Sequence, residues 1–511
     1  MFGRHPRRGA AVSALTADAA RPRLGWPTKA LYGAGAVGTS VKMQLMGLAL
    51  LFYNQLVGLD AAAVSLALFI ALFIDAFWDP IVGQCSDRTR TRLGRRHPYI
   101  YAAAVPASLA FAAIFMPPLG WSDDALFAYL LVVVVASRMF DSLIEIPGSA
   151  LLPELSSDYD ERTSLGSWRF FFLSVVGRPL ATTLAFGVFL KATRHQRFGQ
   201  LNIAGYEPYA LTVAAIAVVA VVGSALATQR FVPFMHRPRK TPGFAAMARA
   251  FAAAVSNRNF VALALSSFIF GIAVGIGGGL QTYFYTYFWE LPSPALFQLG
   301  LWLIPGTLIG VFAAPYLART LGKKTACLIV FFGGIFATTV PIGLRLLGVL
   351  PPNSSPWVLR ILILDQMTIG LLSTTGFVIV TSMLADVVEA VQVRTGERSE
   401  GVLFAADSLL RKVTQSFAVA LPGLLLNVVR FPRHAQPGHV DQGVLIHLAQ
   451  IYLPLVTVLY LCSTSVLMLY RIDRRSHEAD LAKIAEAALL SESTDPELTT
   501  HTDPEIVAGA V

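Results

Sequence analysis

The sequence predicts an all-α membrane protein with twelve transmembrane helices in two pseudo-symmetric six-helix bundles. Three observations predict this fold: an unusually apolar composition, twelve long apolar runs, and matching motifs in the two halves of the chain. Of the 511 residues, 55% are hydrophobic and 14% are charged, whereas soluble domains carry about 25% charged residues. A soluble fold cannot bury this much apolar surface. The composition therefore argues against a soluble enzyme, a disordered chain and a secreted disulfide scaffold.

Twelve apolar runs follow one another along the chain, each close to the roughly 20 residues that a helix needs to cross a bilayer. In the first half they cover 30–57, 61–85, 99–118, 125–152, 164–190 and 208–229. In the second half they cover 260–289, 297–317, 325–348, 357–391, 402–429 and 446–470. The runs are continuous and do not alternate in polarity, so they indicate helices rather than a barrel.

The formal net charge of +9 reflects basic residues that gather in the even-numbered connections between runs. The second connection carries Arg88, Arg90, Arg92, Arg95 and Arg96; the sixth carries Arg237, Arg239 and Lys240; the eighth carries Arg319, Lys323 and Lys324. Basic loops stay in the cytoplasm. We therefore expect both termini there and the protein in the inner cell membrane, although 191–197 and 430–433 are basic exceptions on the other side. Basic cytoplasmic loops account for the positive net charge, so we do not expect nucleic acid as a partner.

These features divide the chain into five parts. They are a basic cytoplasmic tail (1–28), a first six-helix bundle (29–229), a cytoplasmic linker (230–259), a second six-helix bundle (260–471) and a partly disordered cytoplasmic tail (472–511). The first segment lacks the continuous apolar region of a signal peptide. We expect a monomer in the lipid bilayer.

Three short motifs recur in the same order in both halves. Phe52-Tyr53-Asn54 matches Phe284-Tyr285-Thr286, Gly94-Arg95-Arg96 matches Gly322-Lys323-Lys324, and Glu161-Arg162-Thr163 matches Glu397-Arg398-Ser399. The offsets are 232, 228 and 236 residues. Parallel repeats of this kind describe the major facilitator fold, whose binding site lies near mid-membrane between the halves.

One glycine pattern, Gly33 to Gly38, fits the GxGxxG signature of dinucleotide-binding sites. That signature needs a preceding strand, whereas this copy lies inside an apolar run, where small residues allow helices to pack closely. We interpret it, and the glycines at 275–279, as packing positions.

Twelve ionisable residues lie within the apolar runs: Asp75, Asp79, Asp141, Glu145, Asp365, Asp407, Lys42, Arg138, Arg169, Arg178, Arg411 and Lys412. Each costs about 2.5–3.5 kcal/mol at the bilayer centre, or ~30 kcal/mol together, against a typical stability of about 5–15 kcal/mol. Most must therefore face a polar cavity or one another. Such a set suits ion-coupled transport.

Asp75 and Asp79 are the clearest functional signal, because residues four apart share a helix face. Two nearby carboxylates resist double ionisation and favour a cation or a proton. Pro80 removes a backbone donor, so the carbonyl of Ala76 lacks its helical partner. The alternative is that both acids form structural salt bridges with basic residues.

Other charged positions leave alternatives open. Arg138 and Asp141, three residues apart, are expected to pair with each other. Arg169 beside Trp168 can donate to substrate oxygens or pair with an acid, and one of Arg411 and Lys412 should face the cavity. Lys42 is either a partner for the acids or a group that binds an anionic substrate.

The stretch from Ile74 to Gly83 and on to Tyr99 resembles the glycoside–pentoside–hexuronide:cation symporters, the major facilitator branch that includes the melibiose carrier. The resemblance covers about residues 28–471, with further matches at Glu145-Ile146-Pro147, Trp168-Arg169-Phe170-Phe171 and Leu384-Ala385-Asp386-Val387-Val388-Glu389. It implies a carrier rather than an enzyme, with no cofactor, that moves a small substrate together with Na⁺ or H⁺.

The resemblance also implies roles for single residues. It assigns cation binding to Asp75, Asp79, Ser142 and Lys412, with the two acids as metal ligands if the ion is sodium. It assigns substrate contact to Glu145 and Arg169, and we add Trp168, Ser40 and Lys42 as candidates. It assigns a cytoplasmic gate to Asp386 and Glu389, with Arg162 and Arg398 as expected partners.

Two departures from the family pattern narrow the expected function. Ser40 stands where melibiose-type carriers have an acid, which argues against a galactoside, and Trp78 stands where an amide often separates the paired acids, which favours H⁺ over Na⁺. The sequence therefore predicts cation-coupled symport of a sugar, glycoside or sugar acid by alternating access. The main alternative is an amphiphile or lysolipid as cargo. A membrane-embedded enzyme or a channel is less compatible with the pattern.

Overall fold

The computed structural model describes residues 24–156, 158–194, 196–235, 252, 255–395 and 400–472. These residues form helices and loops and include no strand. Among them, twelve helices are long and apolar enough to cross a membrane, in agreement with the twelve predicted runs. Most of the two predicted tails and much of the linker lie outside the described residues.

The first six spans take up residues 26–229. They are α2 (Trp26–Met46) with α3 (Ala49–Leu51) and η1 (Phe52–Val57), α4 (Ala61–Arg88), α5 (His97–Ile114), α6 (Asp123–Leu155), α7 (Tyr159–Phe171) with η2 (Phe172–Gly177), α8 (Arg178–Thr182) and η3 (Thr183–Phe189), and α9 (Tyr206–Gln229). Short 3₁₀ turns, η4 (Gly199–Leu201), η5 (Ile203–Gly205) and η6 (Val232–Phe234), flank α9.

The second six spans take up residues 258–467. They are α11 (Arg258–Tyr283) with η7 (Phe284–Phe288), α12 (Ser293–Leu321), α13 (Lys323–Leu346), α14 (Pro356–Thr395), α15 (Glu400–Val428) and α16 (Gln442–Leu467). The π-helical segments η1 and η7 begin at Phe52 and Phe284, which is the 232-residue offset of the sequence repeat. The repeated motif therefore has the same local backbone form in both halves.

Side-chain caps begin several spans and satisfy backbone donors that a helix start leaves unpaired. Asp60 accepts from the amides of Ala62 and Ala63 at the start of α4, and Asn257 and Asp441 cap α11 and α16 in the same way. These polar residues precede the apolar runs of α4, α11 and α16 and mark where those helices begin.

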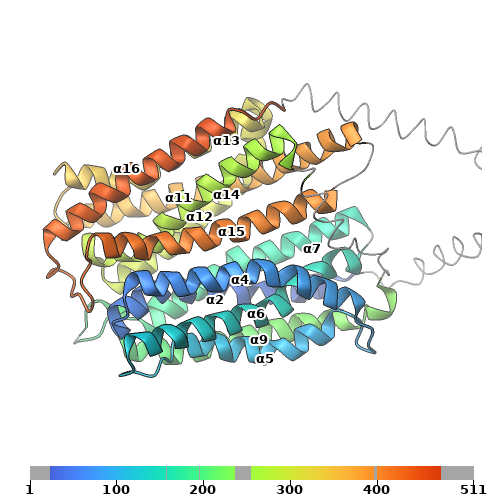
Figure 1. Ribbon diagram of the computed structural model, residues 1–511, viewed down its shortest axis with the longest axis horizontal. Helices are drawn as coiled ribbons and strands as arrows, with labels where there is room; N and C mark the ends of the chain where they lie inside the picture. The colour runs from blue at the N-terminus through green and yellow to red at the C-terminus, as the bar shows by residue number, and fades with distance from the viewer. Residues whose placement is uncertain are drawn as a thin grey trace, which may run out of the picture.

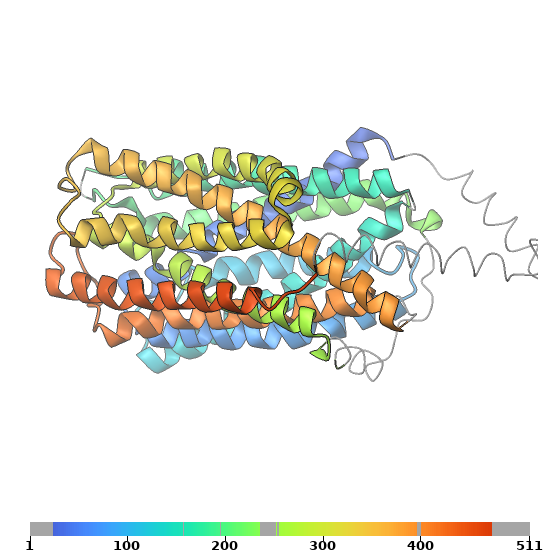
Figure 2. The same ribbon diagram turned by 90° about the horizontal axis from the view of Figure 1, so that it is seen from above.

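The two halves pack as separate groups of helices that meet along α4 and α15 (Figure 1). In the view from above, the second half lies in front of the first and the helices of both run along the same long direction (Figure 2). η3 and α8 contact α12 at a second meeting line. Within the first half, a Cβ on Gly33 would lie 2.7 Å from the carbonyl of Trp168, and one on Gly38 would lie 3.1 Å from Cα of Ala217. The glycine pattern therefore serves close helix packing, as predicted.

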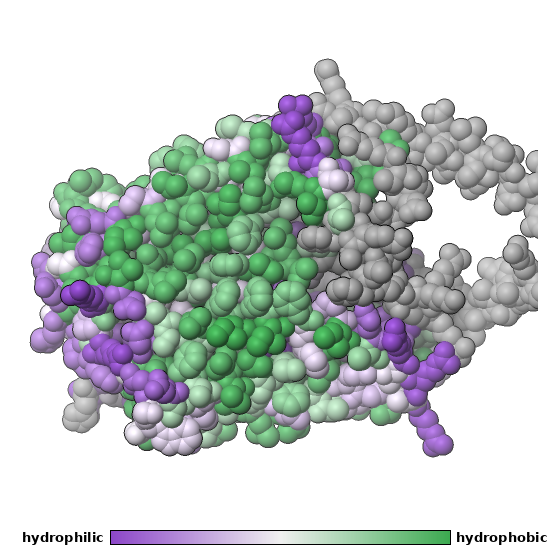
Figure 3. Space-filling model, in the orientation of Figure 1, coloured by the Kyte–Doolittle hydropathy of each residue, from purple (hydrophilic) through white to green (hydrophobic). Residues whose placement is uncertain are grey.

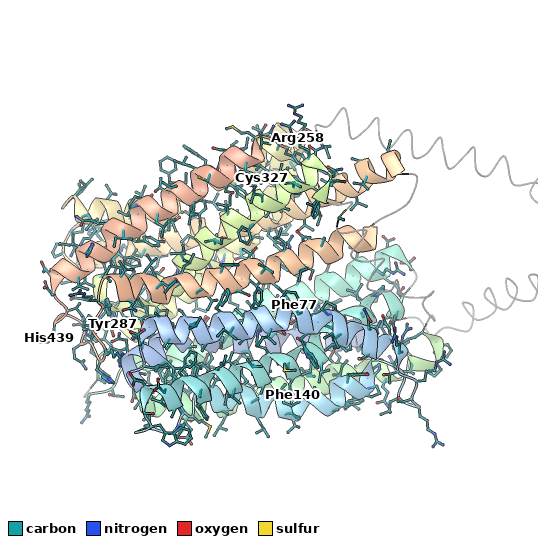
Figure 4. The ribbon with its side chains drawn as sticks, viewed as in Figure 1. Phe77, Phe140, Arg258, Tyr287, Cys327 and His439 are labelled. Carbon is teal, nitrogen blue, oxygen red and sulfur yellow. The ribbon has the colours of Figure 1, made fainter. Side chains whose placement is uncertain are left out.

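The helices run end to end through the molecule, so its two ends differ. We call the end where α2 begins and α16 finishes the terminal end, and the other the opposite end. Figure 4 places Arg258, the start of α11, near the first and Tyr287 and His439 at the second. Apolar residues cover the middle of the face in Figure 3, with hydrophilic residues toward its ends. This band is the surface expected of an integral membrane protein.

Candidate functional site

A central cavity of about 790 Å³ lies between the two halves. Its wall includes seven charged side chains, namely Lys42, Arg138, Asp141, Glu145, Arg169, Asp407 and Arg411. They come from α2, α6, α7 and α15, so both halves contribute. The prediction that most charged residues within the spans face a cavity or one another is therefore confirmed for these seven of the twelve.

A network of hydrogen bonds seals the cavity toward the opposite end. Gln55, at the end of η1, donates from Nε2 to the carbonyl of Pro432, and its Oε1 accepts from Tyr287 Oη and from the amide of Ala435. Tyr283 Oη donates to Asn54 Oδ1 at 2.9 Å. All of these bonds join the first half to the second.

Further contacts extend the same seal. Gln200 bonds to Thr286 and Ser293, and Arg433 pairs with Asp60 and Asp123. These hydrogen bonds and ion pairs join described residues of the two halves at the opposite end. The cavity wall also reaches the terminal-end halves of several helices. The described residues therefore have the arrangement of a carrier open toward the terminal end.

The carboxylate pair of α4 lies at mid-membrane, on the line where the halves meet. Asp75 Oδ1 accepts a hydrogen bond from Ser142 Oγ of α6 at 2.6 Å. Asp75 Oδ2 accepts from Lys412 Nζ of α15 at 2.8 Å, and the same ammonium contacts Asp79 Oδ2. The structure thus brings together all four residues predicted to form the cation site.

Helix geometry explains why this cluster forms. Asp75 and Asp79 lie one turn apart and face inward, with 5% and 12% of their side chains exposed, whereas Phe77 between them is 55% exposed (Figure 4). The guanidinium of Arg138 lies 3.9 Å from Asp75 Oδ2. Asp79 Oδ1 is buried and has no hydrogen-bond partner among the described residues. Two carboxylates are therefore neutralised mainly by one lysine, which the other half supplies.

The pair stands behind the cavity wall rather than in it, since neither acid is among the residues that line the cavity. Carboxylate and hydroxyl oxygens are hard donors that suit hard cations. The oxygens of Asp75, Asp79 and Ser142, with the freed carbonyl of Ala76, could hold Na⁺, and either carboxylate could hold H⁺. The described residues contain no group of three or more His, Cys, Asp or Glu that could hold a metal ion, so Na⁺ here would depend on hydroxyl and carbonyl oxygens beside the two carboxylates.

Three of the five predicted substrate residues, Glu145, Arg169 and Lys42, line the cavity. Lys42 Nζ forms an ion pair with Asp141 Oδ1 at 2.6 Å, so of the two options for Lys42 the structure favours the partner of an acid. The predicted pairing of Arg138 with Asp141 is wrong. Asp141 pairs with α2 instead, and Arg138 turns toward Asp75.

The other two, Ser40 and Trp168, do not line the cavity. Ser40 is 6% exposed and packs against Gly177 of η2, because residues two apart on a helix lie on nearly opposite sides and Lys42 takes the cavity side. The indole of Trp168 stacks with Phe172 at 6.1 Å and contacts Phe171. The structure thus does not support substrate contact by either in this conformation.

Two of the predicted gate residues, Arg162 and Asp386, make contacts within their own half. Arg162 donates to the carbonyls of Ser156 and Pro153, and Asp386 pairs with Lys323 at 2.6 Å. Glu389 lies on α14 with part of its carboxylate buried, and Arg398 lies outside the described residues. These contacts of Arg162 and Asp386 therefore do not connect the two halves.

Sequence reasoning missed two features of the site. Arg411 pairs with Asp407 at 2.6 Å and lies over the ring of Phe377, which their spacing of four residues could have indicated. The seal at the opposite end depends on neutral amides and phenols such as Gln55 and Tyr283, and these residue types give no distinct signal in a sequence.

Comparisons with known proteins agree with this geometry. The model of a family described as MFS/sugar transport protein matches residues 31–474. An isoprimeverose transporter from Lactiplantibacillus pentosus is 25% identical over 88% of this chain and 89% of the relative. The inner membrane symporter YicJ from Escherichia coli strain K12 is 25% identical over 77% of this chain and 81% of the relative.

Among solved structures, a bacterial homolog to the human lysosomal transporter Spinster superposes with a TM-score of 0.62 at 13% identity, covering 89% of this chain and 99% of that chain. A likeness at this identity shows the fold alone. It confirms the predicted major facilitator architecture.

Proposed function

We propose that this chain, which belongs to the MFS/sugar transport protein family, moves a sugar, glycoside or sugar acid together with a cation by alternating access. Membership in the family confirms the predicted resemblance and the prediction of a transporter rather than an enzyme. The cargo and the coupling ion are the proposed part. The names of an isoprimeverose transporter and an inner membrane symporter among its relatives support it.

One observation carries the proposal: Lys412 of the second half bridges Asp75 and Asp79 of the first. A cation that binds the two carboxylates competes with this ammonium for the same oxygens. Binding therefore weakens a contact between the halves at mid-membrane. Because a ligand shifts a conformational equilibrium only through different affinities for the two states, this competition couples ion binding to the movement of the halves.

The cavity wall supports a hydroxyl-rich or acidic cargo. Glu145 can accept hydrogen bonds from hydroxyl groups, while the guanidinium of Arg169 can donate to hydroxyl or carboxylate oxygens. Both line the cavity, and neither forms an ion pair with a described residue. Seven charged residues in a wall that is otherwise mostly apolar suit a cargo with several polar groups, which supports the sugar or sugar acid ahead of the lysolipid.

The coupling ion follows from the same cluster. A single carboxylate suffices for H⁺, whereas Na⁺ needs several oxygens, and Trp78 occupies the position where an amide would add one. The indole donates instead to the carbonyl of Met139 at 3.1 Å. We therefore place H⁺ ahead of Na⁺. The terminal end would face the cytoplasm, as the basic loops predict, and the protein would work as a monomer.

The test is a transport screen with purified protein in liposomes. Radiolabelled monosaccharides, disaccharides, glycosides, uronates and lysolipids are offered under a H⁺ gradient, a Na⁺ gradient or none. We expect accumulation of at least one sugar or sugar acid above its external concentration only with an ion gradient. Accumulation of lysolipids alone, or uptake of a sugar that never exceeds equilibrium under either gradient, would contradict the proposal.

A further inference from the structure

A second cavity, of about 180 Å³, lies inside the second bundle between α11, α13, α14 and α16. It shares Phe270, Val274 and Ser373 with the central cavity. These three residues lie near the middle of their spans, and the cavity extends from them toward the opposite end. It is therefore a side pocket of the central cavity that ends near the seal.

Asp365 of α14 lines this side pocket. Among the residues that the structure describes, none forms a hydrogen bond or an ion pair with its carboxylate. The polar groups that share the pocket with it are neutral: α11 and η7 contribute Gln281 and Tyr285, α13 contributes Thr338, α14 itself contributes Ser373, and α16 contributes Tyr452 and Tyr460. α12, which also packs against α14, contributes no residue to the pocket.

Asp365 thus differs from the acids of the central site. Asp75 and Asp79 are neutralised by Lys412, with Arg138 nearby, and Asp141 by Lys42. No described basic side chain lines the pocket of Asp365. An ionisable residue within a span is costly, and such residues mark substrate or ion pathways and proton relays.

The phenols in the pocket can accommodate either charge state of this acid. Tyr285 Oη accepts a hydrogen bond from Gln281 Nε2 at 3.1 Å, which leaves its own proton free to be donated. The hydroxyl of Tyr452 forms no hydrogen bond with a described residue. A phenol can donate to an ionised carboxylate and accept from a protonated one, so a phenol that turns toward Asp365 would serve either charge state.

We propose that Asp365 is a proton-binding site in the second half of the carrier, separate from the carboxylate pair of the first half. It receives and releases its proton through the central cavity. A metal ion is a poorer occupant, because it would find one anionic ligand among aromatic walls. The pocket lies between the central cavity and the seal, so opening of the seal would bring Asp365 nearer to the other side of the membrane. This proposal does not depend on the identity of the cargo.

Infrared difference spectroscopy of the purified full-length protein in lipid tests the proposal. Spectra are recorded between mildly alkaline and mildly acidic buffer. We expect a C=O stretching band of a protonated carboxyl group that is lost in Asp365→Asn, is kept at a shifted frequency in Asp365→Glu, and shifts in Tyr452→Phe. The difference between wild type and Asp365→Asn should persist in an Asp75→Asn, Asp79→Asn background.

Asp386→Asn is the matched control, because it removes an acid from the same helix that already pairs with Lys323; the band should be unchanged. The same band in Asp365→Asn as in wild type would overturn the proposal. If Asp365→Asn fails to fold, the other two variants still test the proposal. A carboxyl C=O band at the wild-type frequency in both Asp365→Glu and Tyr452→Phe would overturn it. Loss of the Asp365 band on addition of NaCl at constant pH would show a metal ion to be the occupant and would also overturn it.

Discussion

The seal at the opposite end predicts that Gln55→Ala will shift the carrier toward the conformation open at that end. Gln55 is 3% exposed and makes three side-chain hydrogen bonds to the second half, with Pro432, Tyr287 and Ala435. Alanine removes all three and leaves the phenol of Tyr287 with one fewer acceptor. Because those bonds exist only while the seal is closed, their loss destabilises one state and not the other.

The size of the shift follows from the number of bonds. A net hydrogen bond contributes about 0.5–1.5 kcal/mol, so three contribute about 1.5–4.5 kcal/mol. At about 1.4 kcal/mol for each factor of ten, the ratio of the two conformations changes by about 10- to 1,000-fold. A change of this size is enough to invert the populations of two conformations that lie within a few kcal/mol of each other.

Electron–electron double resonance between spin labels at the opposite end measures this shift. Trp121→Cys and His439→Cys place one label on each half at exposed positions, in a background without the three native cysteines. We expect Gln55→Ala to move the distance distribution to longer values. The control is Gln436→Ala, an exposed amide in the same connection as Ala435, which should leave the distribution unchanged. If Gln55→Ala also leaves it unchanged, the proposed role of the seal is wrong.

Three further predictions concern single contacts. In Gly423→Val, the added carbons would collide with the carbonyl of Ala61 and with Ser65. We expect this overpacking to destabilise the sealed conformation by about 1–3 kcal/mol and to lengthen the distances between the spin labels. Unchanged distances would contradict this prediction. Lys412→Gln removes the ammonium that competes at Asp75, so apparent cation affinity should rise by about 5- to 150-fold in calorimetric titrations, and a fall would count against competition. Glu154→Ala removes a carboxylate shared by Arg95 and Arg96, while Arg96 keeps its pair with Asp87. The loss should cost about 1.5–3 kcal/mol and lower the thermal unfolding temperature, whereas Glu154→Gln should lower it less.

Periodicity and composition predicted the fold well, because a bilayer leaves a chain few choices. A span must be long, apolar and helical to satisfy its backbone, so apolar runs alone locate the twelve helices. The motif repeat at 232 residues was confirmed by the π-helical segments that begin at Phe52 and Phe284. Neither observation required knowledge of contacts between helices.

Contacts within the site were predictable only where helix spacing or the family pattern determines them. Asp75 and Asp79 had to share a face, and Ser142 and Lys412 came from the resemblance. The partner of Asp141 was predicted wrongly, because a local candidate three residues away, Arg138, was preferred over Lys42 on another helix. Which of two bases reaches an acid depends on how helices pack, and a single sequence does not contain that information.

Ser40 shows the opposite case, in which the sequence held a signal that was not used. Residues 40 and 42 of one helix lie nearly opposite each other, so Ser40 and Lys42 could not both face one cavity. Lys42 lines the cavity and Ser40 is buried against Gly177. Helix geometry alone therefore allows only one of these two side chains to reach the cavity.

The most direct test of the central claim compares two assays on Asp75→Asn and Asp79→Asn in liposomes. One assay follows uphill uptake under the ion gradient that drives the wild type, and the other follows exchange of labelled for unlabelled substrate at equal concentrations. We predict loss of uphill uptake with exchange retained, since the substrate cavity remains while the ion site is removed. Uphill uptake at the wild-type level in both variants would contradict the claim that this carboxylate pair couples a cation to transport.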